Sequence, residues 1–270
     1  MLTYASLIND AVQRGMPANK ARGILREYLQ ILILKELYRL PEGRKLFFTG
    51  GTYLRLIHHI RRSSEDLDFN AQAINETKFK SMLHKVEMAL KQEGLDVKIK
   101  FRHWGKILVA ELIFPTIEKF YAITSSYTAK EGIVIKIEVN RPQWEITAET
   151  LVVSGFGYLY PVICTEKGAL FADKIDALLN KNRARHLFDI IFMLAHKYPI
   201  NTGVLRTFGI TQPPLELILQ RVNAFSIQEL KKQAESLRPF LFDESAADLI
   251  TNAPLIVKQL IDQYQESAYK

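Results

Sequence analysis

The fold of this chain is decided by Leu46-Phe47-Phe48-Thr49-Gly50-Gly51-Thr52, followed after a short helical segment by Ser64-Glu65-Asp66-Leu67-Asp68-Phe69-Asn70. The pattern predicts an apolar strand over 46–49, a Gly-Gly-Thr turn, a helix over 52–60 and a second strand over 67–70. Side chains alternate between the two faces of a strand, so Asp66 and Asp68 are expected to point to the same side.

Two neighbouring carboxylates repel each other unless a positive charge lies between them. A divalent metal ion that also holds a nucleoside triphosphate fits that position. The Gly-Gly-Thr turn presents backbone N–H groups at the start of a helix, where phosphate binds. Asp-x-Asp alone is common and Gly-Gly alone is usually a simple turn. Their combination in one short segment favours phosphate chemistry, because each motif accounts for the position of the other.

The composition is that of an ordinary globular protein. The 270 residues are 48% hydrophobic and 24% charged, which is enough for one large or two modest domains. The single cysteine, Cys164, excludes an internal disulfide and favours a reducing compartment. It follows two apolar residues and is interpreted as a small buried side chain rather than a nucleophile.

The net charge of +7 fits a protein that handles nucleotides or nucleic acid, although many unrelated proteins are equally basic. The first residues lack the basic and apolar regions of a signal peptide. The apolar run Ile31-Leu32-Ile33-Leu34 is far too short to span a bilayer. We therefore expect a cytoplasmic protein with no membrane partner.

The remaining pattern divides the chain near residue 164. Apolar residues at helical spacing predict helices over 2–14, 18–39 and 77–92. Alternation of apolar and polar residues predicts two strands over 96–103 and 107–114, which a turn at Gly105 joins. It also predicts a strand over 133–139 and one or two short strands over 148–163. Helices alone follow, over 165–180, 184–196, 214–224, 227–238 and 243–267. The expected fold is α/β (α+β), with a mixed sheet flanked by helices in residues 1–163 and a helical domain in residues 164–270.

Glu138 is the candidate for a third acidic ligand. Its strand places Lys136 and Glu138 on one face and the apolar Ile135, Ile137 and Val139 on the other. A carboxylate on a central strand near Asp66 and Asp68 is costly to bury unless it binds a metal or another cation. The alternative is a solvated position at the edge of the sheet.

Lys174 and Asp189 form the second candidate pair. Each is surrounded in the sequence by apolar residues, on consecutive predicted helices. They are interpreted either as a buried structural ion pair or as functional groups. In the functional interpretation, the lysine neutralises triphosphate charge and Asp189 orients the lysine or the acceptor.

These motifs, taken in order, resemble a known family. The matching segments are Gly50-Gly51-Thr52, Arg62-x-Ser64-x-Asp66-Leu67-Asp68-Phe69, Ile135-Lys136-Ile137-Glu138-Val139, Ala172-Asp173-Lys174 and Arg185-His186-Leu187-Phe188-Asp189-Ile190. Together they resemble the AbiEii/AbiGii-type toxins, which are MenT-like nucleotidyltransferases of abortive-infection and type IV toxin–antitoxin systems. The resemblance spans residues 20–195. The glycine and Asp-x-Asp motifs belong to the wider polymerase-β-like superfamily, whereas the Lys-to-Asp helical pair is more particular to this family.

The resemblance implies a nucleotidyltransferase core and a helical domain that closes the active-site cleft. It implies that Gly50, Gly51, Thr52 and Ser64 bind the nucleotide, together with Lys174. Asp66 and Asp68 match the metal-binding pair, and Asp189 matches the late catalytic aspartate. The chain departs from the family at His186, where an acid is frequent, and at Glu138, where Asp is frequent.

The predicted reaction transfers a nucleotide from an NTP. Asp66 and Asp68 are expected to hold Mg²⁺ (or Mn²⁺), with Glu138 as a third ligand. The Gly51–Thr52 amides and Lys174 hold the outer phosphates. Glu138 or Asp189 accepts the proton of the attacking hydroxyl.

The candidate surface for the acceptor is basic. Lys98, Lys100 and Arg102 form a basic strand face that suits an RNA backbone or is simply solvated. Four further arginines, Arg61, Arg62, Arg183 and Arg185, lie near the motifs. The resemblance favours a tRNA 3′ end, with a protein hydroxyl second, and implies a cognate antitoxin as partner. Two other hypotheses remain: a catalytically silent nucleotide- or RNA-binding member, and an interaction protein whose carboxylates are structural.

Overall fold

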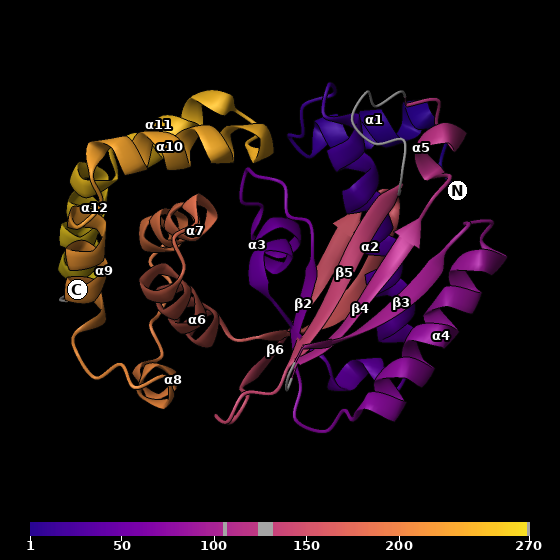
Figure 1. The fold of residues 1–270 in the computed structure, drawn as a ribbon, viewed down its shortest axis with the longest axis horizontal. Coiled ribbons are helices and arrows are strands. Elements are labelled where there is room, and N and C mark those ends of the chain that lie inside the picture. Colours follow the sequence, from indigo (N-terminus) through magenta and orange to yellow (C-terminus); the bar gives the residue numbers. More distant parts are fainter. Residues whose placement is uncertain (105–106, 124–131, 269–270) are drawn as a thin grey trace. The chain divides into compact units, whose positions relative to one another are not determined.

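Seven strands among the described residues form one mixed sheet in the order β3-β4-β5-β2-β1-β7-β6 (Figure 1). They are β1 (Phe47–Thr49), β2 (Leu67–Asn70), β3 (Lys98–Trp104), β4 (Ile107–Phe114), β5 (Ile133–Asn140), β6 (Ala148–Gly155) and β7 (Tyr158–Thr165). β1 pairs antiparallel with β2 and parallel with β7, and β2 pairs parallel with β5. The α/β (α+β) class with a mixed sheet is therefore confirmed.

The computed structural model describes residues 1–104, 107–123 and 132–268. They divide into two compact units, Met1–Thr165 and Glu166–Lys270. The predicted turn at Gly105 lies outside the described residues. No helix among the described residues is long and apolar enough to cross a membrane.

One face of the sheet is apolar and packs against helices of the first unit. Phe48 lies opposite Phe69, and Phe69 lies opposite Val139, so one buried row crosses three strands. α2 (Ala21–Arg39) packs against β5 and β7, α4 (Glu76–Gln92) packs against β3, and the two helices contact each other (Figure 1). The hydrophobic core of this unit lies between these helices and the sheet.

The remaining described helices of the first unit are α1 (Tyr4–Gln13), a 3₁₀ segment at Gly43–Lys45, α3 (Gly50–His58) and the short α5 (Ile117–Phe120). α3 follows β1 without a connecting residue and contacts both β1 and β2. A buried ion pair also ties it to α2, because the Nε of Arg55 donates to Glu27 at 2.8 Å. The start of α3 is thus fixed against the two strands that carry the sequence motifs.

The second unit consists, in its described residues, of helices joined by loops and turns. It contains α6 (Lys167–Asn180), α7 (Ala184–Ala195), α8 (Thr202–Thr207), α9 (Pro214–Asn223), α10 (Ile227–Leu237), α11 (Asp248–Thr251), α12 (Ala253–Ala268) and two 3₁₀ segments at Arg238–Phe240 and Glu244–Ala247. α7 packs against α6, α10, α11 and α12, so it occupies the centre of this unit.

The predicted continuous helix over 243–267 is wrong. A 3₁₀ turn, α11 and α12 share this segment, with a break at Asn252. Pro254 explains the break, because proline lacks the backbone N–H that a helix interior needs and is tolerated in the first turn, where it lies in α12. α5 and α8 were not predicted, since four and six residues are too short to show a helical period.

Candidate active site

The start of α3 brings the glycine motif against the second strand. Gly50 and Gly51 are the first residues of α3, so the helix begins two residues earlier than predicted. Gly50 has a positive φ of 81°, and a Cβ placed there would lie 2.8 Å from the Cβ of Asp68. A Cβ on Gly51 would lie 2.8 Å from the Oγ of Ser64 and 2.9 Å from a guanidinium nitrogen of Arg62. The glycines therefore allow these side chains to approach the helix N-terminus closely.

Thr52 connects the same helix to the acidic motif. Its hydroxyl donates to the backbone carbonyl of Asp66, and the side chain is fully buried. The hydroxyl thereby fixes the segment that leads into β2. The hydroxyl of Thr52 is thus engaged, and the group of Thr52 that remains for the predicted phosphate contact is its backbone N–H in the first turn of α3.

The polar face of the sheet carries the carboxylates. Asp68 of β2 lies opposite Thr49 of β1 on one side and opposite Glu138 of β5 on the other. Directly opposed residues point to the same face, so Asp68 and Glu138 are neighbours. β5 lies between β4 and β2, which excludes the edge position that was the alternative for Glu138. Asp66 comes immediately before β2.

Lys136 lies between two of these carboxylates. Its ammonium is 2.9 Å from the Oε1 of Glu138 and 3.5 Å from the Oδ2 of Asp66. The three side chains are 25%, 19% and 27% exposed, respectively, so the cluster is half-buried. Burial opposes the charge of Lys136, but the hydrogen bond to Glu138 and the charge of Asp66 outweigh it and raise the lysine pKa. Lys136 is therefore a firmly charged counterion.

The donors of this cluster suit a divalent metal ion. Mg²⁺ is usually held by one or two carboxylates together with substrate phosphates and waters, and Asp66 and Asp68 supply two hard oxygen ligands. The hydroxyl of Thr49, beside Asp68, is buried with no hydrogen-bond partner among the described residues. Within the described part of the chain, no group of three or more His, Cys, Asp or Glu side chains is placed to hold a metal. The residues fit a metal held by two carboxylates, and Glu138 as a third ligand stays a prediction.

In the second unit, Lys174 of α6 and Asp189 of α7 form an ion pair. The ammonium lies 2.8 Å from the Oδ2 of Asp189, and the side chains are 10% and 0% exposed. A charge pair with this little exposure needs each partner to compensate the other. The contact agrees with both interpretations of the pair, so its role in binding a nucleotide stays a prediction.

His186 lies one turn before Asp189 on α7 and is also buried. Neither ring nitrogen has a hydrogen-bond partner among the described residues. Burial, reinforced by the charge of Lys174, lowers the histidine pKa to about 3. His186 is therefore neutral near pH 7 and does not replace the acid that is frequent at this position in the family.

Sequence reasoning missed two residues of the first unit's site. Lys136 was placed on the same face as Glu138, but its pairing with two carboxylates was not predicted. Arg62 was included in the family motif and noted as a nearby cation, but the position of its buried guanidinium against Gly51 was not predicted. A charged residue flanked by apolar neighbours, as in Ile135-Lys136-Ile137, was the available signal for the first of them.

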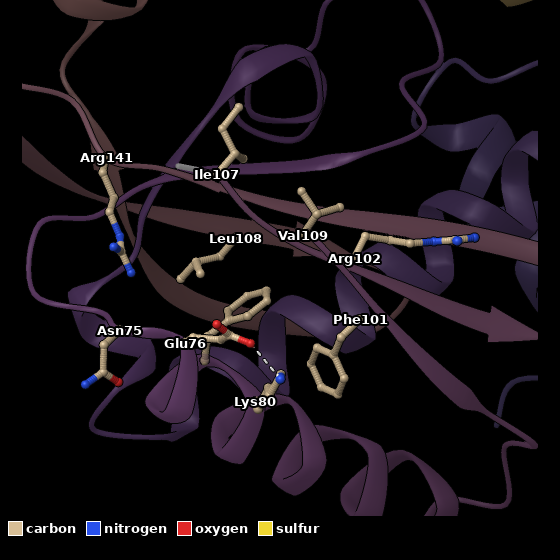
Figure 2. Close-up of a pocket in the computed structure, with 10 residues that line it drawn as sticks. Asn75, Glu76, Lys80, Phe101, Arg102, Ile107, Leu108, Val109 and Arg141 are labelled. Carbon is tan, nitrogen blue, oxygen red and sulfur yellow. Dashed lines mark ion pairs between the residues drawn. The ribbon is translucent and has the colours of Figure 1, made fainter. Parts of the chain in front are cut away.

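A separate pocket lies between the start of α4 and the β3–β4 pair (Figure 2). Its volume is about 390 Å³, and its apolar lining includes Phe79, Phe101 and Leu108. Its charged side chains already have partners. Lys80 pairs with Glu76 at 2.6 Å, Arg102 pairs with Glu111 at 3.0 Å, and Arg141 donates to the carbonyl of Ile74 at 2.7 Å. None of the predicted site residues lines this pocket.

The mixed sheet, the glycine start of α3 and the adjacent Asp68 and Glu138 define a nucleotidyltransferase fold. The chain matches the family described as "Nucleotidyl transferase AbiEii toxin, Type IV TA system" over residues 32–252, and it belongs to that family. The family is one of nucleotidyltransferase toxins of type IV toxin–antitoxin systems. Comparison with curated proteins gives no match.

Solved structures share the fold at low sequence identity. MenT4, a nucleotidyltransferase toxin of Mycobacterium tuberculosis, has a TM-score of 0.58 and 17% identity, over 98% of this chain and 93% of its own. JHP933 from Helicobacter pylori gives 0.56 and 17%, over 92% and 95%. A putative nucleotidyltransferase from H. pylori gives 0.55 and 18%, over 90% and 96%.

Proposed function

We propose that this protein is a metal-dependent toxin that transfers a nucleotide from an NTP to an RNA acceptor, with the tRNA 3′ end as the first candidate. The observation that carries the proposal is the packing of Asp68 against Gly50 at the start of α3, with Glu138 opposite Asp68 on the next strand. Acidic groups and phosphate-binding amides are thereby adjacent within one rigid part of the fold. This is the pairing that transfer from a triphosphate requires.

Asp66 and Asp68 are the residues that would hold Mg²⁺ or Mn²⁺, which supplies charge neutralisation for the triphosphate when bound. The amides at the start of α3 bind the outer phosphates, and Arg62 beside Gly51 adds positive charge there. The attacking hydroxyl oxygen forms a bond to the α-phosphorus, and the bond to pyrophosphate breaks. Glu138 accepts the hydroxyl proton, so that pyrophosphate leaves without needing one.

We assign Lys174 and Asp189 to the same reaction on the family resemblance. In this assignment, the ammonium of Lys174 contacts the nucleotide phosphates, and Asp189 keeps the lysine charged and oriented through the 2.8 Å contact. The burial of Asp189 supports a role in holding the lysine, because a fully buried carboxylate is a poor direct acceptor of a substrate proton.

An RNA acceptor is favoured by the charge on the polar face of the sheet. Lys100 lies opposite Glu111, and Glu111 lies opposite Lys136, so the basic positions of β3 share a face with the acidic cluster. Lys98 and Lys100 are exposed on the strand at the edge of the sheet. Cations near the reacting groups suit a phosphate backbone, which supplies most of the affinity of a nucleic acid. We propose that the toxin acts in the cytoplasm, where NTPs and tRNA are present, and is opposed by a cognate antitoxin.

The test is transfer of label from each of four α-³²P-NTPs, with Mg²⁺, to total tRNA and to lysate protein. We expect labelled tRNA from the wild type and at least a hundredfold less from Asp68→Asn, in line with the loss of a group that holds a catalytic charge. Asp262→Asn, the same change on an exposed face of α12, is the matched control and should label normally. Expression of the wild type or of Asp262→Asn should arrest growth, and expression of Asp68→Asn should not.

Three outcomes would contradict the proposal in different ways. Label in protein alone would make a protein hydroxyl the acceptor. Saturable NTP binding without transfer to any acceptor would favour the catalytically silent alternative. Full transfer by the folded Asp68→Asn variant would remove the acidic cluster from the mechanism.

A further inference from the structure

The contacts of Lys136 place a cation where a bound metal ion would need its ligands. Its ammonium spans from Glu138 on its own strand to Asp66 ahead of the neighbouring strand, at 2.9 Å and 3.5 Å. Asp66 is one of the two carboxylates assigned to the metal. A carboxylate that is paired with an ammonium binds a second cation less strongly, because the two positive charges repel each other.

The position of Lys136 on β5 confines its side chain to one face of the sheet. β5 is an interior strand, and its other face is filled by Ile135, Ile137 and Val139, which are fully buried. The lysine side chain is therefore confined to the polar face, and its half-buried stem limits its reach. Its register partner on β4 is Glu111, which pairs with Arg102 at 3.0 Å. Glu111 already has a cation of its own, so Lys136 is directed toward the acidic cluster.

We propose that Lys136 is a positioning residue that acts as a built-in counterion, competing with the divalent cation for Asp66 in the absence of nucleotide. The competition keeps metal affinity low until a triphosphate brings its own negative charge and draws the ammonium away from Asp66. Metal and nucleotide thus bind together more favourably than either binds alone. The inference rests on the proposed function only in requiring a metal ion at Asp66 and Asp68.

The test measures Mn²⁺ binding to the nucleotide-free protein by electron paramagnetic resonance. Lys136→Met keeps an unbranched side chain, one atom shorter, and removes its charge. We expect this variant to bind Mn²⁺ about three- to tenfold more tightly than the wild type. Lys100→Met is the matched control, because Lys100 lies in the same cross-strand row, two strands away from Lys136. It should change the Mn²⁺ dissociation constant by less than about twofold.

Two further variants separate the contact from a general effect of charge. Lys136→Arg preserves the charge and should bind Mn²⁺ as weakly as the wild type. In an Asp66→Asn background, the gain from Lys136→Met should shrink, because the shared carboxylate has lost its charge. Lys136→Gln serves if the methionine variant does not fold, as judged by circular dichroism and thermal unfolding.

Unchanged or weaker Mn²⁺ binding by a folded, uncharged Lys136 variant would overturn the inference. The inference would also be overturned if the wild type bound Mn²⁺ no more tightly than the Asp66→Asn variant does, because Asp66 would then not hold the metal. A wild type that binds Mn²⁺ in the expected pattern but transfers no nucleotide would refute the proposed function and leave the role of Lys136 intact.

Discussion

His186 makes folding stability depend on pH. Its pKa is lowered to about 3 by burial and by the charge of Lys174, whereas an unfolded histidine titrates near pH 6.5. Between these values the unfolded chain binds one more proton than the folded protein does. Stability is therefore lost as the pH falls below about 6.5, by about 1.4 kcal/mol for each pH unit.

We therefore expect His186→Leu to resist mild acid better than the wild type. Between pH 6.5 and pH 5 the wild type should lose about 2 kcal/mol more of its free energy of unfolding than the variant does. Urea denaturation at both pH values measures this difference, and carboxylates that titrate in both proteins cancel. Equal losses in the two proteins would show that the imidazole is solvated in the folded state.

At the scale of elements, the start of α3 combines a left-handed backbone conformation, which favours glycine, with a close contact. Gly50 and Gly157 have nearly equal positive φ values of 81° and 77°. A Cβ on Gly157 would meet nothing within 4 Å, whereas one on Gly50 would lie 2.8 Å from the Cβ of Asp68. The two glycines are therefore a matched pair that separates backbone strain from displacement of Asp68.

Gly157→Ala should cost about 1 kcal/mol of stability and leave nucleotide transfer unchanged. Gly50→Ala should cost a further 1–3 kcal/mol, since packed atoms must move to admit the methyl group, and should also reduce transfer strongly. Denaturant unfolding and the labelled-NTP assay measure the two effects. Equal behaviour of the two variants would mean that Asp68 adjusts without loss.

The strands and helices whose apolar residues recur at regular spacing were predictable from the sequence. Alternation in residues 98–102 placed Lys98, Lys100 and Arg102 on one face, and the register with β4 confirms it. The apolar positions of α2 were equally clear, but the sequence did not reveal that the polar Glu27 is buried there. Glu27 is compensated by Arg55 from another helix, and a contact between distant segments leaves no local period.

The site was predictable only as far as its local motifs extend. Asp66 and Asp68 were placed on one side by strand alternation, whereas Lys136 reached Asp66 through the parallel pairing of β2 with β5. Which strands become neighbours depends on tertiary packing. An ion pair between Lys174 and Asp189 was one of the two interpretations of the sequence, because both residues lie among apolar neighbours on predicted helices.

At the scale of the whole molecule, the net charge of +7 predicts salt-dependent binding of RNA. If Lys98 and Lys100 contact phosphates, their joint replacement by Gln should weaken tRNA binding. It should also lower the slope of log K against log salt by about 1–2, one unit or slightly less for each lost contact. Fluorescence anisotropy between 50 and about 200 mM salt measures this slope.

Lys231→Gln with Lys232→Gln is the control for that experiment. It removes the same charge from an exposed part of α10 in the helical unit. A slope that falls equally in both double variants would indicate a general effect of net charge rather than RNA contacts at Lys98 and Lys100.

The strand order also dictates when during synthesis the catalytic groups can assemble. β1 emerges early, yet one of its neighbours, β7, pairs Cys164 with Phe48 across more than a hundred intervening residues. Glu138 likewise reaches Asp68 only after β5 has left the ribosome. Closing such long loops costs conformational entropy before the distant strands can pair and stabilise the sheet. The sheet therefore forms late. If nucleotide transfer needs Glu138 beside Asp68, the nascent chain is inactive through at least the first half of its translation.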